Sequence, residues 1–155
     1  MRQEKNAHNA KENYTYDEKS QKVKVTYTFN EKHFDGKLVT SSQKGRFKNE
    51  LGTEWAVRPY LGVVYLPFHL PFDLPYYVLD VGDADANGLY SSIICAAPDG
   101  SWMYIMTRQQ VMSEASLEPH LAFVEKLGFA RCSLMVFPQQ GEVQTTPAAS
   151  DALQH

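Results

Sequence analysis

Pro75-Tyr76-Tyr77-Val78-Leu79-Asp80 opens the part of the sequence that decides the fold. Two similar runs follow, Leu89-Tyr90-Ser91-Ser92-Ile93-Ile94 and Ser101-Trp102-Met103-Tyr104-Ile105-Met106-Thr107-Arg108. A helical segment separates them from a last run, Arg131-Cys132-Ser133-Leu134-Met135-Val136-Phe137. Short β runs joined by tight loops, with a single late helix, are typical of the closing half of a small antiparallel barrel. Such barrels more often enclose a ligand than catalyse a reaction.

The first half of the chain continues the strand pattern. A clean alternation puts four apolar side chains on one face, Val23, Val25, Tyr27 and Phe29. An Asp35-Gly36 turn follows, and then weaker strand patterns over 37–48 and 53–58. We therefore predict an all-β fold, an antiparallel up-and-down barrel.

The helix and the domain limits can also be predicted. Ser113 is a good N-cap and Gly128 a good stop for an amphipathic helix, which we expect to pack on the outside of the barrel. A last strand is expected at 134–137. One barrel domain over 13–140 would then lie between a disordered segment, 1–12, and a disordered tail, 141–155.

The segment 59–75 has an unusual composition, because four prolines stand among large apolar residues. Proline at this density disfavours a central strand, so we expect an apolar loop. Residues 61–74 are a candidate lip at the barrel mouth and a candidate for peripheral membrane contact; the alternative is a loop docked on its own barrel.

Composition excludes several classes of protein. With 155 residues, 43% of them hydrophobic and 21% charged, the chain has the size and balance of one globular domain. A net charge of −3 with scattered basic residues argues against nucleic acid as a partner. No secretory signal is visible, so we expect a cytoplasmic protein, or a secreted or membrane-associated one if the N-terminus is truncated. Cys95 and Cys132 are expected to be buried free thiols.

The order of these segments resembles a lipocalin, in particular the branch with apolipoprotein D and the bacterial lipocalins. The resemblance covers about residues 13–140. Pro75-Tyr76-Tyr77-Val78-Leu79 is similar to one strand of the family, and Leu89-Tyr90 to the start of the next. In the run from Trp102 to Arg108, Tyr104 stands at the usual tryptophan position and Arg108 at the motif arginine.

One family element has no counterpart here. Lipocalins open with a Gly-x-Trp strand, and no tryptophan precedes Trp55. The resemblance therefore implies an incomplete barrel, in which Arg108 lacks the tryptophan that its counterpart packs against. Either the chain is truncated or another segment fills the gap.

A lipocalin-like barrel implies a cavity for a small hydrophobic ligand, such as a fatty acid, lysophospholipid, sterol or pigment. The strand phases give nine candidate ligand-binding residues: Tyr14, Tyr16, Val25, Tyr27, Phe29, Trp55, Val57, Tyr77 and Tyr104. The alternative is that these side chains fill a solid core. Tyrosine favours the cavity, because a buried hydroxyl needs a partner that a ligand can supply.

Other functions have weaker support. A lipid- or carotenoid-modifying enzyme on the same scaffold would need Cys95 as its thiol, and an interaction module would pair through open strand edges, for example as a homodimer. Asp83-Ala84-Asp85-Ala86-Asn87-Gly88 copies half of a calcium loop, but Ile94 stands where its final glutamate is required. We predict a binding protein with no catalytic residues, metal or cofactor.

Overall fold

The computed structural model describes residues 6–63, 66–69 and 72–140. The expected disordered tail, 141–155, lies outside these ranges. Residues 1–5 of the expected disordered N-terminal segment, 1–12, lie outside them as well. Within it the chain forms eight strands, an α-helix and a short 3-10 helix: β1 (Ala7–Asp17), β2 (Lys22–Glu31), β3 (Leu38–Phe47), β4 (Glu54–Val63), β5 (Leu66–His69), β6 (Leu74–Val81), β7 (Ser92–Ala96), β8 (Met103–Thr107), α1 (Glu114–Lys126) and η2 (Arg131–Ser133).

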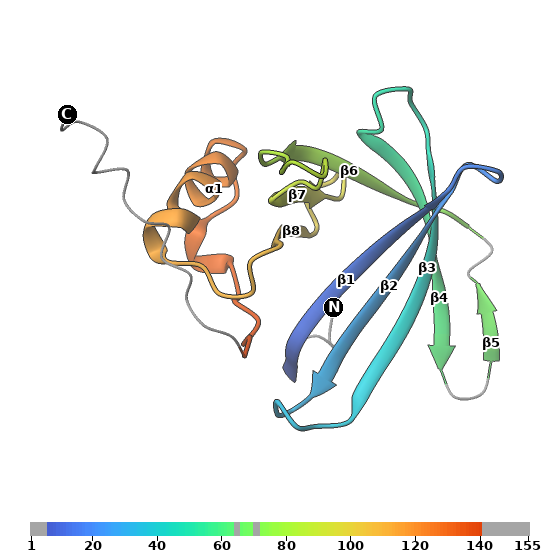
Figure 1. Cartoon of the computed structure of the whole chain (residues 1–155), viewed down its shortest axis with the longest axis horizontal. Helices are drawn as coiled ribbons and strands as arrows, with labels where there is room; N and C mark the ends of the chain where they lie inside the picture. Colours follow the sequence, from blue (N-terminus) through green and yellow to red (C-terminus); the bar gives the residue numbers. More distant parts are fainter. Residues whose placement is uncertain (1–5, 64–65, 70–71, 141–155) are drawn as a thin grey trace.

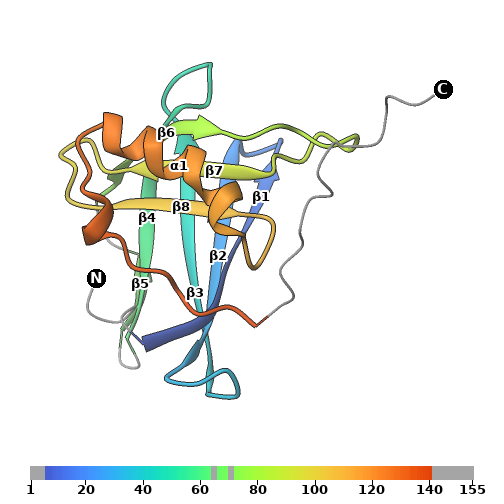
Figure 2. The same cartoon turned by 90° about the vertical axis from the view of Figure 1, so that its left-hand side faces the viewer.

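The strands form one antiparallel sheet in the order β1-β2-β3-β4-β6-β7-β8, and β5 pairs with the second half of β4. The first four strands lie side by side as long curved ribbons, while β6, β7 and β8 cross over them (Figures 1 and 2). The sheet therefore curls into a half-barrel whose two parts face each other across an interior. The predicted all-β antiparallel class is confirmed, and the barrel is incomplete.

The inner face of this sheet carries the apolar side of the alternating strands. Val23, Val25, Trp55 and Val57 are buried together, and Tyr14, Tyr76 and Val78 pack against them. Register brings these residues together, because Tyr14 lies opposite Val25 and Trp55 opposite Tyr76. The outward positions of β2 and β3 hold lysine and arginine instead, which keeps that side in water.

Helix α1 covers the outer face of β6 to β8, on the side away from β1 to β4 (Figures 1 and 2). The predicted N-cap is confirmed, since the Ser113 hydroxyl accepts a hydrogen bond from the Ser116 N–H. Val124 of the helix and Ile94 of β7 are both 0% exposed. Strand β7 is thus buried on both faces, by the helix outside and the interior within.

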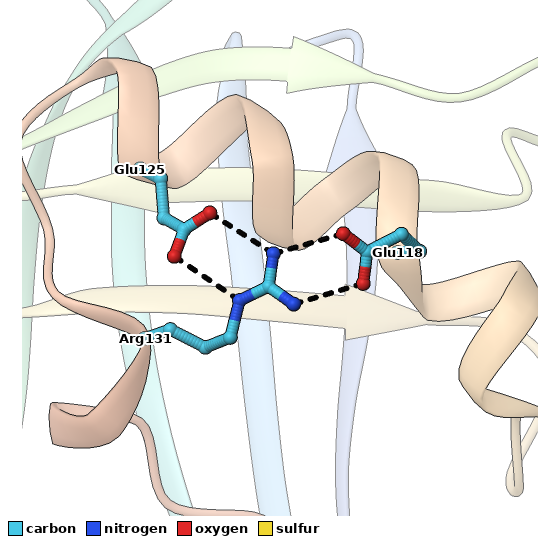
Figure 3. Close-up of polar contacts among 3 residues, drawn as sticks. All are labelled: Glu118, Glu125 and Arg131. Atoms are coloured by element: carbon cyan, nitrogen blue, oxygen red, sulfur yellow. Dashed lines mark hydrogen bonds and ion pairs between the residues drawn. The ribbon is translucent and has the colours of Figure 1, made fainter.

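Arg131 fastens η2 to the helix. Its guanidinium forms ion pairs with Glu118 and Glu125, each at 2.9 Å, and clamps the two carboxylates of one helix face (Figure 3). These side chains are solvent-exposed, so the ion pairs contribute little to stability. They hold η2 beside the helix.

Three expected boundaries need correction. Residues 7–12, expected to be disordered, belong to β1; a bulge near Asn9 and few apolar side chains hide this strand in the sequence. The proline-rich segment, expected to be a loop, contains β5 and the end of β4. Pro59 is the last residue of β4 that pairs with β3, and Pro67 lies on β5 at the edge of the sheet. Both are positions that tolerate a missing N–H.

The strand expected at 134–137 is also absent from the described structure, where these residues are irregular. The chain beyond them reaches β1 instead: the Asn9 N–H donates to the Pro138 carbonyl at 2.9 Å, and the Gln139 amide donates to the Ala10 carbonyl at 3.0 Å. The end of the described chain therefore covers the first residues of the β1 edge.

The half-barrel stays open on one side. In the part of the chain that the structure describes, β1 and β8 end the sheet and do not pair with each other. Two open edges are what a barrel lacking one strand leaves. A homodimer through these edges and a membrane contact at 61–74 remain predictions. None of the helices in the described ranges has the length and apolarity needed to cross a bilayer.

Candidate ligand-binding site

A continuous series of aromatic rings lines the interior. We call it the aromatic wall, and it comprises Tyr14, Phe47, Trp55, Tyr76, Trp102 and Tyr104. Trp55 stacks on Tyr76 with ring centroids 5.4 Å apart, and Tyr76 lies 5.5 Å from Trp102. Trp55 also meets Phe47 at 5.2 Å and Tyr14 at 5.9 Å. The wall thus joins β1, β3, β4 and β6 with the residues at the start of β8.

The wall is not sealed from solvent. Phe47 is 40% exposed and Tyr16, whose ring lies 5.6 Å from it, is 47% exposed. The other rings of the wall, apart from buried Trp55, are half-buried. A solid core would bury such large side chains almost completely. The interior therefore presents accessible apolar surface of the kind that binds ligands.

Polar groups cross the interior within this aromatic surface. We call them the polar row: Glu12, Tyr14, Tyr76 and Cys95. The Tyr14 hydroxyl donates to the Glu12 carboxylate and lies 3.2 Å from the Tyr76 hydroxyl. Cys95 lies on the same face of the neighbouring strand, since it pairs with Val78, two residues beyond Tyr76. The row thus includes residues of β1, β6 and β7.

Burial controls the protonation of this row. It raises the pKa of both tyrosines far above the ordinary range, and the charge of Glu12 raises that of Tyr14 further. Burial also raises the pKa of the Cys95 thiol to about 12. All three groups are therefore neutral at pH 7, and Cys95 is not the thiolate that nucleophilic chemistry requires.

Eight of the nine predicted site residues share the inner face by register: Tyr14, Tyr16, Val25, Tyr27, Phe29, Trp55, Val57 and Tyr104. Tyr77 is the exception. It pairs with Glu54 and Ala96, one position out of step with Trp55 and Cys95, so it lies on the outer face. The predicted inward orientation of Tyr77 is wrong, and Tyr76 takes that place.

Sequence reasoning missed five residues of the wall and the row: Glu12, Phe47, Tyr76, Cys95 and Trp102. Residues 76 and 77 are both tyrosine, so the alternation of apolar and polar residues does not indicate which of the two faces the interior. Trp102 could have been found, because it stands two residues before Tyr104 and therefore shares its face; their centroids are 5.6 Å apart. Glu12 carried no signal, since a carboxylate on an inner face contradicts the apolar pattern.

Arg108 directly follows β8, beside a pocket of about 390 Å³ that Asp83, Ser92 and His120 also line. Its Nε donates to the Tyr90 carbonyl at 3.1 Å, and its N–H donates to that of Ser91 at 2.8 Å. Arg108 thus holds the 82–91 loop against the end of β8, and its side chain is exposed.

Ser92 and His120 resemble a catalytic pair, with the hydroxyl 3.0 Å from the imidazole Nε2. However, the His120 Nδ1 is buried and lacks a partner within the described structure. A buried unpaired N–H is costly, so we assign the proton to Nε2, which donates it to Ser92. In this form the ring cannot take the serine proton, and the contact ties helix to sheet.

The acidic 83–88 segment is a turn. Asp85 accepts hydrogen bonds from the N–H groups of Leu89 at 2.9 Å and Asn87 at 2.8 Å, which lower the pKa of its carboxyl group. Its oxygen is therefore engaged by its own loop. Within the described ranges, no group of three or more His, Cys, Asp or Glu side chains is placed to hold a metal ion.

Comparison with known families gives an independent result. A family model described as a lipocalin-like domain matches residues 1–139, which is nearly the whole of the described structure. A search of curated proteins gives no match to this chain. The family typically binds small hydrophobic ligands, in agreement with the aromatic interior. On the family match and the curled antiparallel sheet together, the chain belongs to the family of lipocalin-like domains.

Proposed function

We propose that this protein binds a small hydrophobic ligand against the aromatic wall and transports or stores it. The observation that carries the proposal is the partial exposure of large inner-face rings, such as Phe47 and Tyr16, in a sheet that curls around them. Covering such surface with an apolar ligand contributes about 25 cal/mol per Å² of apolar area removed from water.

Apolar and polar residues have different roles in the proposed binding. Trp55 and Tyr76 form a stacked platform for a flat or extended apolar body, with Trp102 beside it. The polar row then gives the interior one place for a ligand's polar end. This division between apolar walls and a few placed polar groups is typical of small-molecule sites.

Binding without chemistry is the simpler reading of the same residues. The enzyme alternative needed a reactive thiol at Cys95, and burial raises the pKa of that thiol to about 12. A neutral thiol is a poor nucleophile at pH 7. We therefore propose a carrier or store.

Titration with prodan, a neutral naphthalene dye whose emission shifts in apolar surroundings, tests the proposal. We expect saturable binding with one site per chain and energy transfer from Trp55 or Trp102. Tyr76→Ala should weaken binding about tenfold or more, since a buried aromatic contact is worth roughly 1–3 kcal/mol. Tyr77→Ala, the matched change on the outer face, should leave the affinity unchanged. Equal effects of the two variants, or no saturable binding, would contradict the proposal.

A further inference from the structure

The part of the interior that a ligand can reach is mainly aromatic. The valines of the core lie behind the rings: Val23, Val25 and Val57 are each 3% or 4% exposed. The rings of the aromatic wall are, with one exception, half-buried or exposed. Two aliphatic side chains near them, Val78 and Met106, are half-buried as well. A ligand on the inner face therefore contacts aromatic rings more than aliphatic side chains.

Trp102 differs from the other tryptophan of the wall, because no ring of the described structure lies flat on it. Its contacts with Tyr76 and Tyr104 are tilted, by 48° and 41°, with ring centroids 5.5 and 5.6 Å apart. Trp55, in contrast, stacks on Tyr76 at 26° and meets Phe47 edge-on. Trp102 is half-buried, whereas Trp55 is 9% exposed. The indole of Trp102 is therefore the one of the two that has surface left for a ligand.

The backbone holds Trp102 at the open side of the half-barrel. The residue directly precedes β8, and β8 ends the sheet. Its carbonyl accepts a hydrogen bond from the Ala97 N–H at 3.1 Å, which fixes it at the start of the β7–β8 ladder. Alternation then places its ring on the same face as Tyr104. The indole is thus anchored to the sheet and lies on the face that carries the wall.

We propose that the site is selective for ligands with flat, fused aromatic rings over saturated ones, and that Trp102 determines this selectivity by stacking on the ligand. The inference rests on the proposed ligand-binding function. Offset-stacked and edge-to-face ring pairs are stabilising beyond the apolar area that they bury. A saturated ring of the same skeleton gains the burial alone. The hydrophobic effect by itself predicts the opposite order, because the saturated compound is the more apolar of the two.

Two rigid alcohols with one carbon skeleton test the inference: naphthalen-2-ylmethanol and (decahydronaphthalen-2-yl)methanol, each measured by displacement of prodan. In both, the hydroxyl group is on a saturated carbon, so the polar end is the same. An aromatic pair contributes about 0.5–1.5 kcal/mol beyond its burial, which is about twofold to tenfold in affinity. The naphthalene compound, which can contact more than one ring of the wall, should therefore bind at least about threefold more tightly.

Three variants assign the preference to its residue. Trp102→Leu keeps an apolar side chain but removes the ring, so it should remove most of the preference while leaving the affinity for the saturated alcohol within about threefold. Trp102→Phe keeps a ring and should retain most of the preference. Tyr77→Leu is the matched control, because Tyr77 lies on the outer face, and it should leave the ratio of the two affinities unchanged. Circular dichroism and a melting curve of each variant establish that it folds.

The outcomes separate the two proposals. If prodan binds but the saturated alcohol competes as well as the aromatic one, the aromatic preference is wrong and the ligand-binding function stands. The same holds if Trp102→Leu keeps the ratio, or if Trp102→Phe loses it as fully as Trp102→Leu does. If neither prodan nor either alcohol binds, the proposed function fails and this inference fails with it.

Discussion

The indole of Trp55 lies on the phenol of Tyr76 with ring centroids 5.4 Å apart and an angle of 26° between the planes. The two residues are direct partners in the β4–β6 ladder, at the point where the long strands meet the crossing ones. The stack therefore joins the two parts of the half-barrel, and the stability of the fold depends on the same rings that form the candidate site.

The first prediction concerns this stack. Trp55 is 9% exposed, so Trp55→Ala should lower the free energy of unfolding by about 3–5 kcal/mol, the range for a large buried aromatic residue. Trp102→Ala, which removes a half-buried ring, should cost clearly less. Urea denaturation followed by far-UV circular dichroism measures both, and equal losses would argue against Trp55 as the junction.

Thiol reactivity distinguishes the two cysteines. Cys132, expected from the sequence to be buried, is exposed in η2, while Cys95 is 0% exposed. In the native protein at pH 8, Ellman's reagent should modify one thiol quickly, and Cys132→Ser should remove this reaction. Cys95 should react only on unfolding. Rapid modification of two thiols in the folded chain would mean that the interior is far more open than described.

Alkaline pH should destabilise the protein through the polar row. Burial raises the pKa of Cys95 to about 12, against an ordinary value of about 8.5 to 9. The stabilising contribution of a group with a raised folded pKa is complete below its unfolded pKa and is lost as pH rises toward the folded one. The free energy of unfolding should therefore fall between about pH 9 and 12, and less steeply in Cys95→Ala. A flat profile in this window would contradict the burial of the row.

Asp73 gives a test at acid pH. Hydrogen bonds from Arg46 and Arg58, at 2.9 and 2.8 Å, lower the pKa of this carboxyl group. A lowered folded pKa stabilises above the unfolded value and stops doing so as pH falls through the folded one. Asp73→Asn should thus be destabilising at pH 7, by less than about 1 kcal/mol because the arginines are exposed, and the difference from the parent should be smaller at pH 3, below the ordinary carboxyl pKa. Asp35→Asn is the surface control, and thermal melts at the two pH values give the comparison.

Elements could be predicted from the sequence where a local signal, such as apolar alternation or a helix cap, determines the structure. Strand β2 buries Val23 and Val25 and exposes Lys22 and Lys24, so alternation was sufficient to place it. Helix α1 was equally readable, since Ser113 satisfies its free N–H groups and Gly128 adopts a φ of +92° just beyond its end.

The remainder depended on tertiary contacts. Strand β1 begins at Ala7 because β2 supplies its hydrogen bonds, although its first residues are mostly polar. The phase of Tyr76 and Tyr77 is fixed by Trp55 across the ladder, a contact between residues 21 positions apart. Glu12 acquires its role only when Tyr14 and Tyr76 lie beside it. Most of these contacts join residues that are far apart in the sequence, so the pattern of neighbouring residues does not reveal them.

The most direct test of ligand binding is to locate a bound ligand by NMR, in protein with labelled methyl groups and prodan added. Ligand on the inner face should give intermolecular nuclear Overhauser effects to Val25 and Val57, which line the interior, and none to Ile94 and Val124, which lie between sheet and helix. Contacts confined to Ile94 and Val124, or no contacts at saturating ligand, would contradict the account.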